Sequence, residues 1–113
     1  MENGALQSAP LTEATFLILL SLATPKHGYG IMQDVAAWSG EKNKLGPGTL
    51  YGVLTKLLDQ RLIRRATDSK DEDERRKSYV LTPAGRQLLE QECARLEWVA
   101  SLGRRVLNGE GAA

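Results

Sequence analysis

The sequence predicts a mainly α-helical α+β fold in which three helices and a β-hairpin precede one long C-terminal helix. Four segments carry apolar residues at helical spacing, and two short runs of alternating residues flank the polar stretch DSKDEDE. The chain has 113 residues, of which 42% are hydrophobic and 26% charged. That length and balance are typical of one small globular domain.

The first helix is expected to run from Thr12, as its N-cap, to Ala23. The ten residues before Leu11 are small and polar, so we expect 1–10 to form a disordered tail. The helix is apolar nearly all round, and a helix of this kind must be covered on more than one side. We therefore expect a partner subunit to cover the face that includes Phe16.

A second helix is predicted from Gly28 to Ser39, after a turn at residues 26–28 that follows the helix-breaking Pro25. Ile31, Val35 and Trp38 share one stripe of this helix, and Gly40 suits its C-terminal cap.

A third helix is predicted to begin at Pro47, because proline fits the first turn of a helix. One face carries apolar residues at spacings of three and four: Leu50, Val53, Leu54, Leu57 and Leu58. The opposite face is small and polar, which leaves it free for another molecule.

Two strands are expected within residues 62–67 and 75–81, followed by a helix that Thr82 caps and Pro83 begins. Apolar residues of the last helix alternate spacings of four and three, as in a coiled coil, which predicts a dimerisation helix at 82–108. We expect a winged domain at 11–81 before it and a disordered tail at 109–113 after it. The predicted interface residues are Phe16, Leu89, Cys93, Leu96, Ala100 and Leu107.

Three helices followed by a hairpin are the parts of a winged helix-turn-helix, whose third helix enters the major groove of DNA. The exposed face of that helix must be small and must offer hydrogen-bonding groups, as Gly48, Thr49, Tyr51 and Lys56 do. Seven basic residues lie close by within residues 61–77, but five acidic residues occupy the same stretch.

Three segments, HGYGIMQDV, LGPGTLYGVLTKLLDQRLI and RRKSYVLTPAGRQLL, closely resemble the PadR family of bacterial transcriptional regulators. The resemblance extends from Leu11 to about Trp98, and the chain length resembles the short subfamily with a single C-terminal helix. It implies a homodimeric repressor that leaves double-stranded operator DNA when a small molecule binds.

The resemblance also assigns residues. It implies DNA contacts by Tyr29, by Thr49, Tyr51 and Lys56 of the third helix, and by Arg75, Arg76 and Lys77 of the wing. Some short members stack planar aromatic effectors between tryptophans of paired C-terminal helices, and Trp98 lies in a similar region. The sequence departs from the family pattern in the acidic DEDE run of its wing.

Other classes of function have little support. One histidine and one cysteine, Cys93, provide neither a cluster of metal ligands nor a set of catalytic groups, so we expect no metal, no cofactor and no enzyme activity. The longest apolar run is too short to cross a membrane, and no signal peptide is evident, which suggests a cytoplasmic protein.

Two alternatives stay open from the sequence. The acidic wing is compatible with a winged-helix module that binds protein and not DNA. Tyr29 and Tyr51 are compatible with core aromatic residues, and Trp98 with ordinary interface packing.

Overall fold

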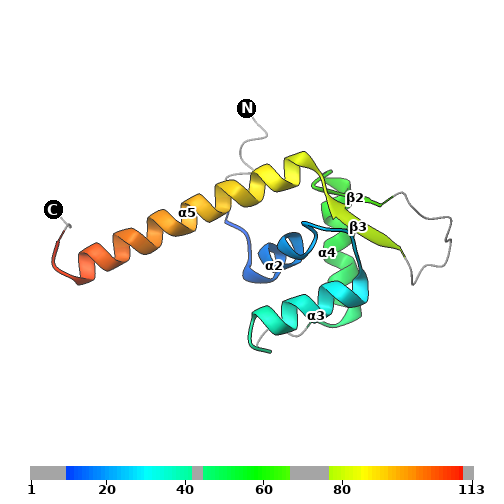
Figure 1. The fold of residues 1–113 in the computed structure, drawn as a ribbon, viewed down its shortest axis with the longest axis horizontal. Helices are drawn as coiled ribbons and strands as arrows, with labels where there is room; N and C mark the ends of the chain where they lie inside the picture. Colours follow the sequence, from blue (N-terminus) through cyan, green and yellow to red (C-terminus); the bar gives the residue numbers. More distant parts are fainter. Residues whose placement is uncertain (1–9, 42–44, 67–76, 111–113) are drawn as a thin grey trace.

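The computed structural model describes residues 10–41, 45–66 and 77–110 of the chain. Its elements are, in order, α2 (Glu13–Ser21), β1 (Lys26–His27), α3 (Gly28–Trp38), α4 (Pro47–Asp59), β2 (Ile63–Arg65), β3 (Ser78–Leu81) and α5 (Pro83–Leu107) (Figure 1). The predicted mainly helical α+β class is confirmed. The predicted terminal tails and wing tip fall largely outside the described residues.

The sheet has three strands in the order β1-β3-β2, with both pairs antiparallel. The prediction of a two-stranded hairpin, with only a turn at residues 26–28, is therefore wrong in strand number. Lys26 pairs with Tyr79 and His27 with Ser78. Two residues are too few to show an alternating pattern. The strand is defined by its pairing with β3, which lies some fifty positions further along the chain.

The hydrophobic core lies between α2, α3, α4, the sheet and the start of α5. On α4 the predicted apolar stripe is buried at Leu50, Leu54 and Leu57, which turns the polar face outward. On α3 the buried residues include Ile31 and Val35, but the side chain of Trp38 is 50% exposed. The predicted stripe thus fails at its last member, because the core covers α3 only as far as Val35.

Side-chain caps explain where α2 and α5 begin. Thr12 accepts a hydrogen bond from the Thr15 amide at 3.1 Å, and Thr82 accepts one from the Gly85 amide at 3.1 Å. Gly40 follows α3 with a φ of +66°, a conformation that favours glycine.

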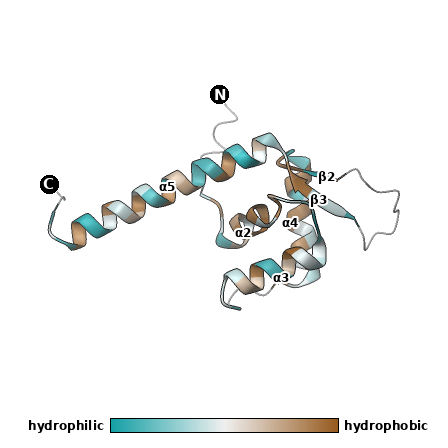
Figure 2. Cartoon of the chain, in the orientation of Figure 1, coloured by the Kyte–Doolittle hydropathy of each residue, from teal (hydrophilic) through white to brown (hydrophobic). Residues whose placement is uncertain are grey.

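Helix α5 has 25 residues, but its buried residues, which include Leu88, Leu89 and Glu92, all lie in its first half. The second half extends away from the rest of the chain (Figure 1). Hydrophobic and hydrophilic bands alternate along it (Figure 2), so the chain leaves an apolar stripe of this helix uncovered.

Candidate nucleic-acid interface

The exposed face of α4 is the centre of the candidate interface. Leu50, Leu54 and Leu57 fix the rotation of this helix by packing into the core. The residues on the opposite side are all exposed: Gly48, Thr49, Tyr51, Gly52, Thr55 and Lys56. The Thr55 hydroxyl donates a hydrogen bond to the Tyr51 carbonyl, one turn earlier on the same helix, at 2.9 Å.

Tyr29 and Tyr51 lie at the junction of α3 and α4. Tyr29, in the first turn of α3, is 68% exposed and is therefore not a core aromatic residue. Tyr51 is 41% exposed, and the hydroxyl end of its ring lies against Gly28, where an added Cβ would overlap Oη and lie 3.0 Å from Cζ. The lack of a side chain at Gly28 thus lets the Tyr51 ring pack against the first turn of α3, the turn that carries Tyr29.

Neither helix of this pair has a side-chain cap at its N-terminus. The N-cap residue of α3 is His27, whose side chain makes no bond to the first turn, and that of α4 is Gly46, which has no side chain. The amide groups of a helix N-terminus carry partial positive charge and suit an anionic partner such as a phosphate.

The wing also carries exposed basic side chains. Arg64 and Arg65 of β2 are exposed, and the Arg64 guanidinium donates a hydrogen bond to the Arg65 carbonyl at 3.3 Å. Within the described ranges, Lys56, Arg64 and Arg65 have no ion-pair partner. Lys77 precedes β3 and is half-buried, whereas Arg75 and Arg76 lie outside the described residues.

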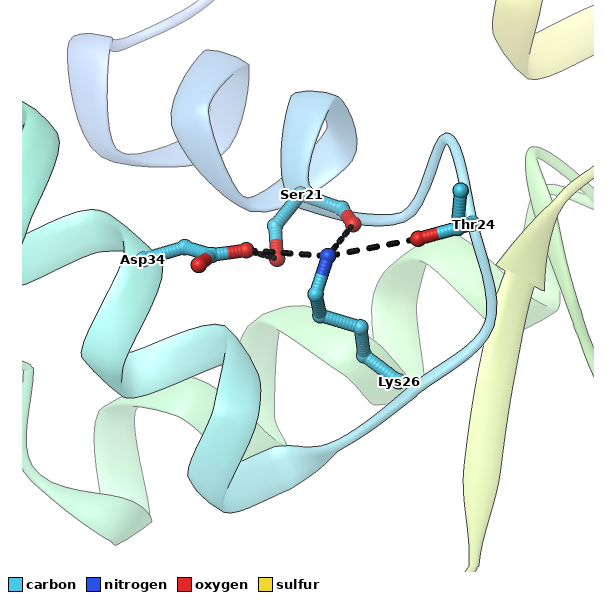
Figure 3. A network of polar contacts seen from close by, with 4 residues as sticks. All are labelled: Ser21, Thr24, Lys26 and Asp34. Atoms are coloured by element: carbon cyan, nitrogen blue, oxygen red, sulfur yellow. Dashed lines mark hydrogen bonds and ion pairs between the residues drawn. The ribbon is translucent and has the colours of Figure 1, made fainter.

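A polar network that was not predicted from the sequence joins α3 to α2 and β1 (Figure 3). The Ser21 hydroxyl donates to Asp34 Oδ2 at 2.7 Å, and Lys26 Nζ forms an ion pair with the same oxygen at 3.1 Å. Lys26 Nζ also donates to the Ser21 carbonyl at 3.1 Å and to Thr24 Oγ1 at 3.3 Å. The network joins α2, β1 and α3. The three residues Ser21, Lys26 and Asp34 share no local pattern that would have predicted it.

The predicted interface and effector residues of α5 have different surroundings. Trp98 is 62% exposed and Leu96 43% exposed, and Cys93, Ala100 and Leu107 are exposed as well. Leu89 is buried in the core of its own chain, so it has little surface left for a partner. Phe16 is half-buried against that core.

A second carboxylate site joins α5 to the segment that leads into α2. Glu92 is buried, and it accepts bonds from the Arg95 guanidinium at 3.0 and 2.7 Å and from the Leu11 amide at 3.2 Å. The hydrogen bonds from Arg95 lower the pKa of Glu92, with the Leu11 amide adding to the effect against the opposing effect of burial. The Glu92 carboxylate is therefore ionised at neutral pH.

The described residues contain no group of three or more histidine, cysteine, aspartate or glutamate side chains arranged to hold a metal ion. None of their helices is both long enough and apolar enough to cross a membrane.

Several known proteins are similar to this chain. A relative from Streptomyces fradiae, an uncharacterised 37.1 kDa protein of a transposon, is 43% identical over 81 residues, which are 71% of this chain and 22% of that protein. The chain therefore corresponds to about a fifth of the length of that relative.

Solved structures of transcriptional regulators are among the similar proteins. A transcriptional regulator from Clostridium thermocellum has a TM-score of 0.63 and 25% identity, over 86% of this chain and 90% of that one. Bordetella bronchiseptica BpsR, whose DNA binding is regulated by 6-hydroxynicotinic acid, has a TM-score of 0.62 and 26% identity, over 83% and 65% of the chains. A PadR family regulator from Clostridium difficile has the same fold, with a TM-score of 0.68 and 23% identity over 85% and 99% of the chains.

The family model that describes the transcriptional regulator PadR-like family matches residues 16–91, from within α2 to the middle of α5. That range includes the exposed face of α4, the two tyrosines at its junction with α3, and the wing. The chain belongs to the PadR-like family of transcriptional regulators.

Proposed function

We propose that this chain is a ligand-responsive repressor that binds operator DNA as a two-fold homodimer, with α4 of each subunit in the major groove. The observation that carries the proposal is the exposed face of α4, where Thr49, Tyr51 and Lys56 point away from a core that Leu50, Leu54 and Leu57 hold. A helix presented in this way can approach base edges and phosphates.

Charge supports the same surface. Lys56, Arg64 and Arg65 are exposed and, among the described residues, carry no ion pair, so their charges are available to phosphates. Tyr29 and the first amide groups of α3 and α4 add hydrogen-bond donors at the same junction. From the sequence we add Arg75, Arg76 and Lys77 as wing contacts to the DNA backbone.

A second copy of the chain is the occupant that we propose for the uncovered stripe of α5. The apolar side chains of its second half are exposed or half-buried: Leu96, Val99, Leu102, Val106 and Leu107. An exposed apolar stripe of this length is typical of an interface, and the coiled-coil spacing suits pairing with another helix. Two-fold pairing would also give one recognition helix to each half of a palindromic site.

Release by an effector is the third part of the proposal. Trp98 is exposed on α5, and two-fold pairing could bring it close to the partner's Trp98, with a slot for a planar aromatic molecule between the two indoles. Regulation of BpsR by 6-hydroxynicotinic acid, a small planar aromatic acid, supports this mode of control for a protein of this fold. The competing proposal, a module that binds protein in place of DNA, rested on the acidic wing, and no feature of the described surface favours it.

The proposal is tested by fluorescence anisotropy with labelled DNA from upstream of the chain's own coding region, titrated at several salt concentrations. We expect saturable binding. The logarithm of the association constant should fall linearly with the logarithm of the salt concentration, because phosphate contacts release counterions. An unrelated duplex of equal length is the control. Equal affinity for both duplexes, or no dependence on salt, would contradict the proposal.

A further inference from the structure

The two threonines on the exposed face of α4 differ in what their hydroxyl groups offer to another molecule. The Thr55 hydroxyl donates its proton to the Tyr51 carbonyl at 2.9 Å. A hydroxyl has one proton and two acceptor lone pairs, so toward a partner Thr55 presents an acceptor only. The Thr49 hydroxyl has no such bond among the described residues and is free to donate. We propose that Thr55 determines operator specificity by accepting a hydrogen bond from the amino group of an adenine or a cytosine in the major groove.

The surroundings of Thr55 leave its hydroxyl open to a base edge. Leu54 and Leu57, on either side of it in the sequence, are buried and fix the rotation of the helix, while Thr55 is exposed. Gly52 is the neighbour of Thr55 on the helix surface, three residues earlier, and an added Cβ there would have nothing within 4 Å. Glycine inside a helix lowers stability relative to alanine, and no packing among the described residues requires it here. Close approach of another molecule is a reason for a bare turn beside Thr55.

The neighbouring charges place Thr55 against base edges and away from phosphates. Asp59 is one turn after Thr55 on the same side of α4, is exposed, and has no ion pair within the described ranges. A carboxylate repels a phosphate, so this side of the helix is poorly suited to the DNA backbone. Lys56 lies about 100° further round the helix and carries the positive charge that suits phosphates. The side with Thr55 and Asp59 offers acceptors, and the groups of the major groove that match acceptors are the amino groups of adenine and cytosine.

The opposite direction of the bond is less favourable. To donate to guanine or to thymine O4, the Thr55 hydroxyl would have to give up its bond to the Tyr51 carbonyl, so one bond would replace another. Accepting from an amino group keeps the existing bond and adds a second. Thr55 therefore favours the sequence that places an amino group opposite it.

This inference rests on the proposed function, and its test uses the same anisotropy assay with the operator duplex and the unrelated duplex. Thr55→Val removes the hydroxyl at nearly constant shape and helix propensity, and Thr55→Ser keeps the hydroxyl. Thr55→Val should weaken operator binding about tenfold, since the bond lost in each of two half-sites reduces affinity about threefold. Its affinity for the unrelated duplex and its salt dependence should not change. Thr55→Ser should bind the operator within about twofold of the native chain, and both variants should unfold at the native temperature because the site is exposed.

Base analogues test the direction of the bond. Unsubstituted purine in place of adenine, or pyrimidin-2-one in place of cytosine, removes the amino group, and a 7-deazapurine removes the acceptor N7. At one base pair of a half-site, the amino-free analogue should weaken binding by the native chain about threefold more than binding by Thr55→Val. The analogue that does so identifies the base. The 7-deazapurine should affect the two chains equally. Thr49→Val is the matched control, and its loss of affinity should be the same with and without the amino-free analogue.

Two kinds of result would overturn the assignment. One is a Thr55→Val variant that binds the operator as tightly as the native chain, or that loses equal affinity for both duplexes. The other is a 7-deazapurine, in place of the amino-free analogue, whose effect depends on Thr55. Each of these leaves the proposed function in place. A native chain that binds both duplexes equally would instead contradict the proposed function, and this inference with it.

Discussion

Gly85, in the first turn of α5, lies directly against the main-chain carbonyl of Leu62, and a Cβ at this position would overlap that oxygen. Thr82 strengthens the same joint, because its hydroxyl donates to the Arg61 carbonyl at 2.8 Å and its amide to the Leu62 carbonyl at 3.1 Å. The turn that ends α4 is thus bonded to the start of α5 through the backbone. The start of α5 is therefore fixed to the end of α4, the helix that we propose enters the major groove.

The first prediction is that Gly85→Ala destabilises the fold by about 1–3 kcal/mol, because the neighbour is backbone and cannot move aside as a side chain would. Urea unfolding of the full chain measures the change. Gly52→Ala is the control, since nothing lies within 4 Å of an added Cβ there and alanine favours a helix interior. Equal stability of the two variants would contradict the close contact.

Only part of this joint can be predicted from the sequence. Thr82 as an N-cap and the four helices were predicted, because caps and apolar stripes are local patterns. Strand β1, the network of Ser21, Lys26 and Asp34, and the bond from the Leu11 amide to Glu92 were not predicted. Each of these depends on groups that are distant in the sequence, and no spacing along the chain encodes such a pairing.

The candidate site shows the same division. The exposed face of α4 follows from the stripe on its other side, so Thr49, Tyr51 and Lys56 were correctly placed on the surface. Leu89 was assigned to an interface because its heptad position matches that of Leu96. The structure buries Leu89 in its own chain, since α5 packs on the core over its first turns before it projects.

The second prediction concerns pH. Because Arg95 lowers the pKa of Glu92 in the folded chain below its ordinary value of 4.5, the carboxylate contributes stability that is present above that value. The contribution is lost as the pH falls through the lowered pKa. Glu92→Gln should therefore lower the melting temperature at pH 7, and the difference from the native chain should shrink below pH 4.5. A difference that stays constant from pH 7 to pH 3 would contradict the assignment of the ionised form.

The third prediction is that Lys56→Ala weakens operator binding through a phosphate contact. The loss of affinity should be similar for the operator and for unrelated DNA. The slope of the logarithm of the association constant against the logarithm of salt concentration should become shallower by about one for each Lys56 in the complex. Anisotropy titrations measure both quantities. Arg86→Ala is the control, since Arg86 is an exposed cation on α5 that pairs with Glu90 at 4.0 Å. An unchanged affinity and slope would remove Lys56 from the interface.

The fourth prediction concerns assembly. The native chain should have about twice the 12.4 kDa mass of one chain in light scattering at micromolar concentration. Ala100→Glu should give monomers, because Ala100 is exposed in the single chain and a charge matters there only when a partner covers it. Gln91→Glu adds the same charge to another exposed position of α5 and should stay dimeric. A native chain that is monomeric and fully folded at this concentration would contradict the dimer.

The last prediction concerns the effector slot at Trp98. Its indole is 62% exposed, and in a two-fold dimer a planar aromatic molecule could stack between it and the partner's Trp98. Such a ligand should quench tryptophan fluorescence. It should also reduce operator affinity if it binds more tightly to the dimer conformation in which the spacing of the two α4 helices does not match the DNA. Trp38→Phe removes the other indole, which is 50% exposed on α3, and should keep both responses. Trp98→Ala should lose both, and quenching with DNA release that survives this substitution would show that the planar ligand binds elsewhere.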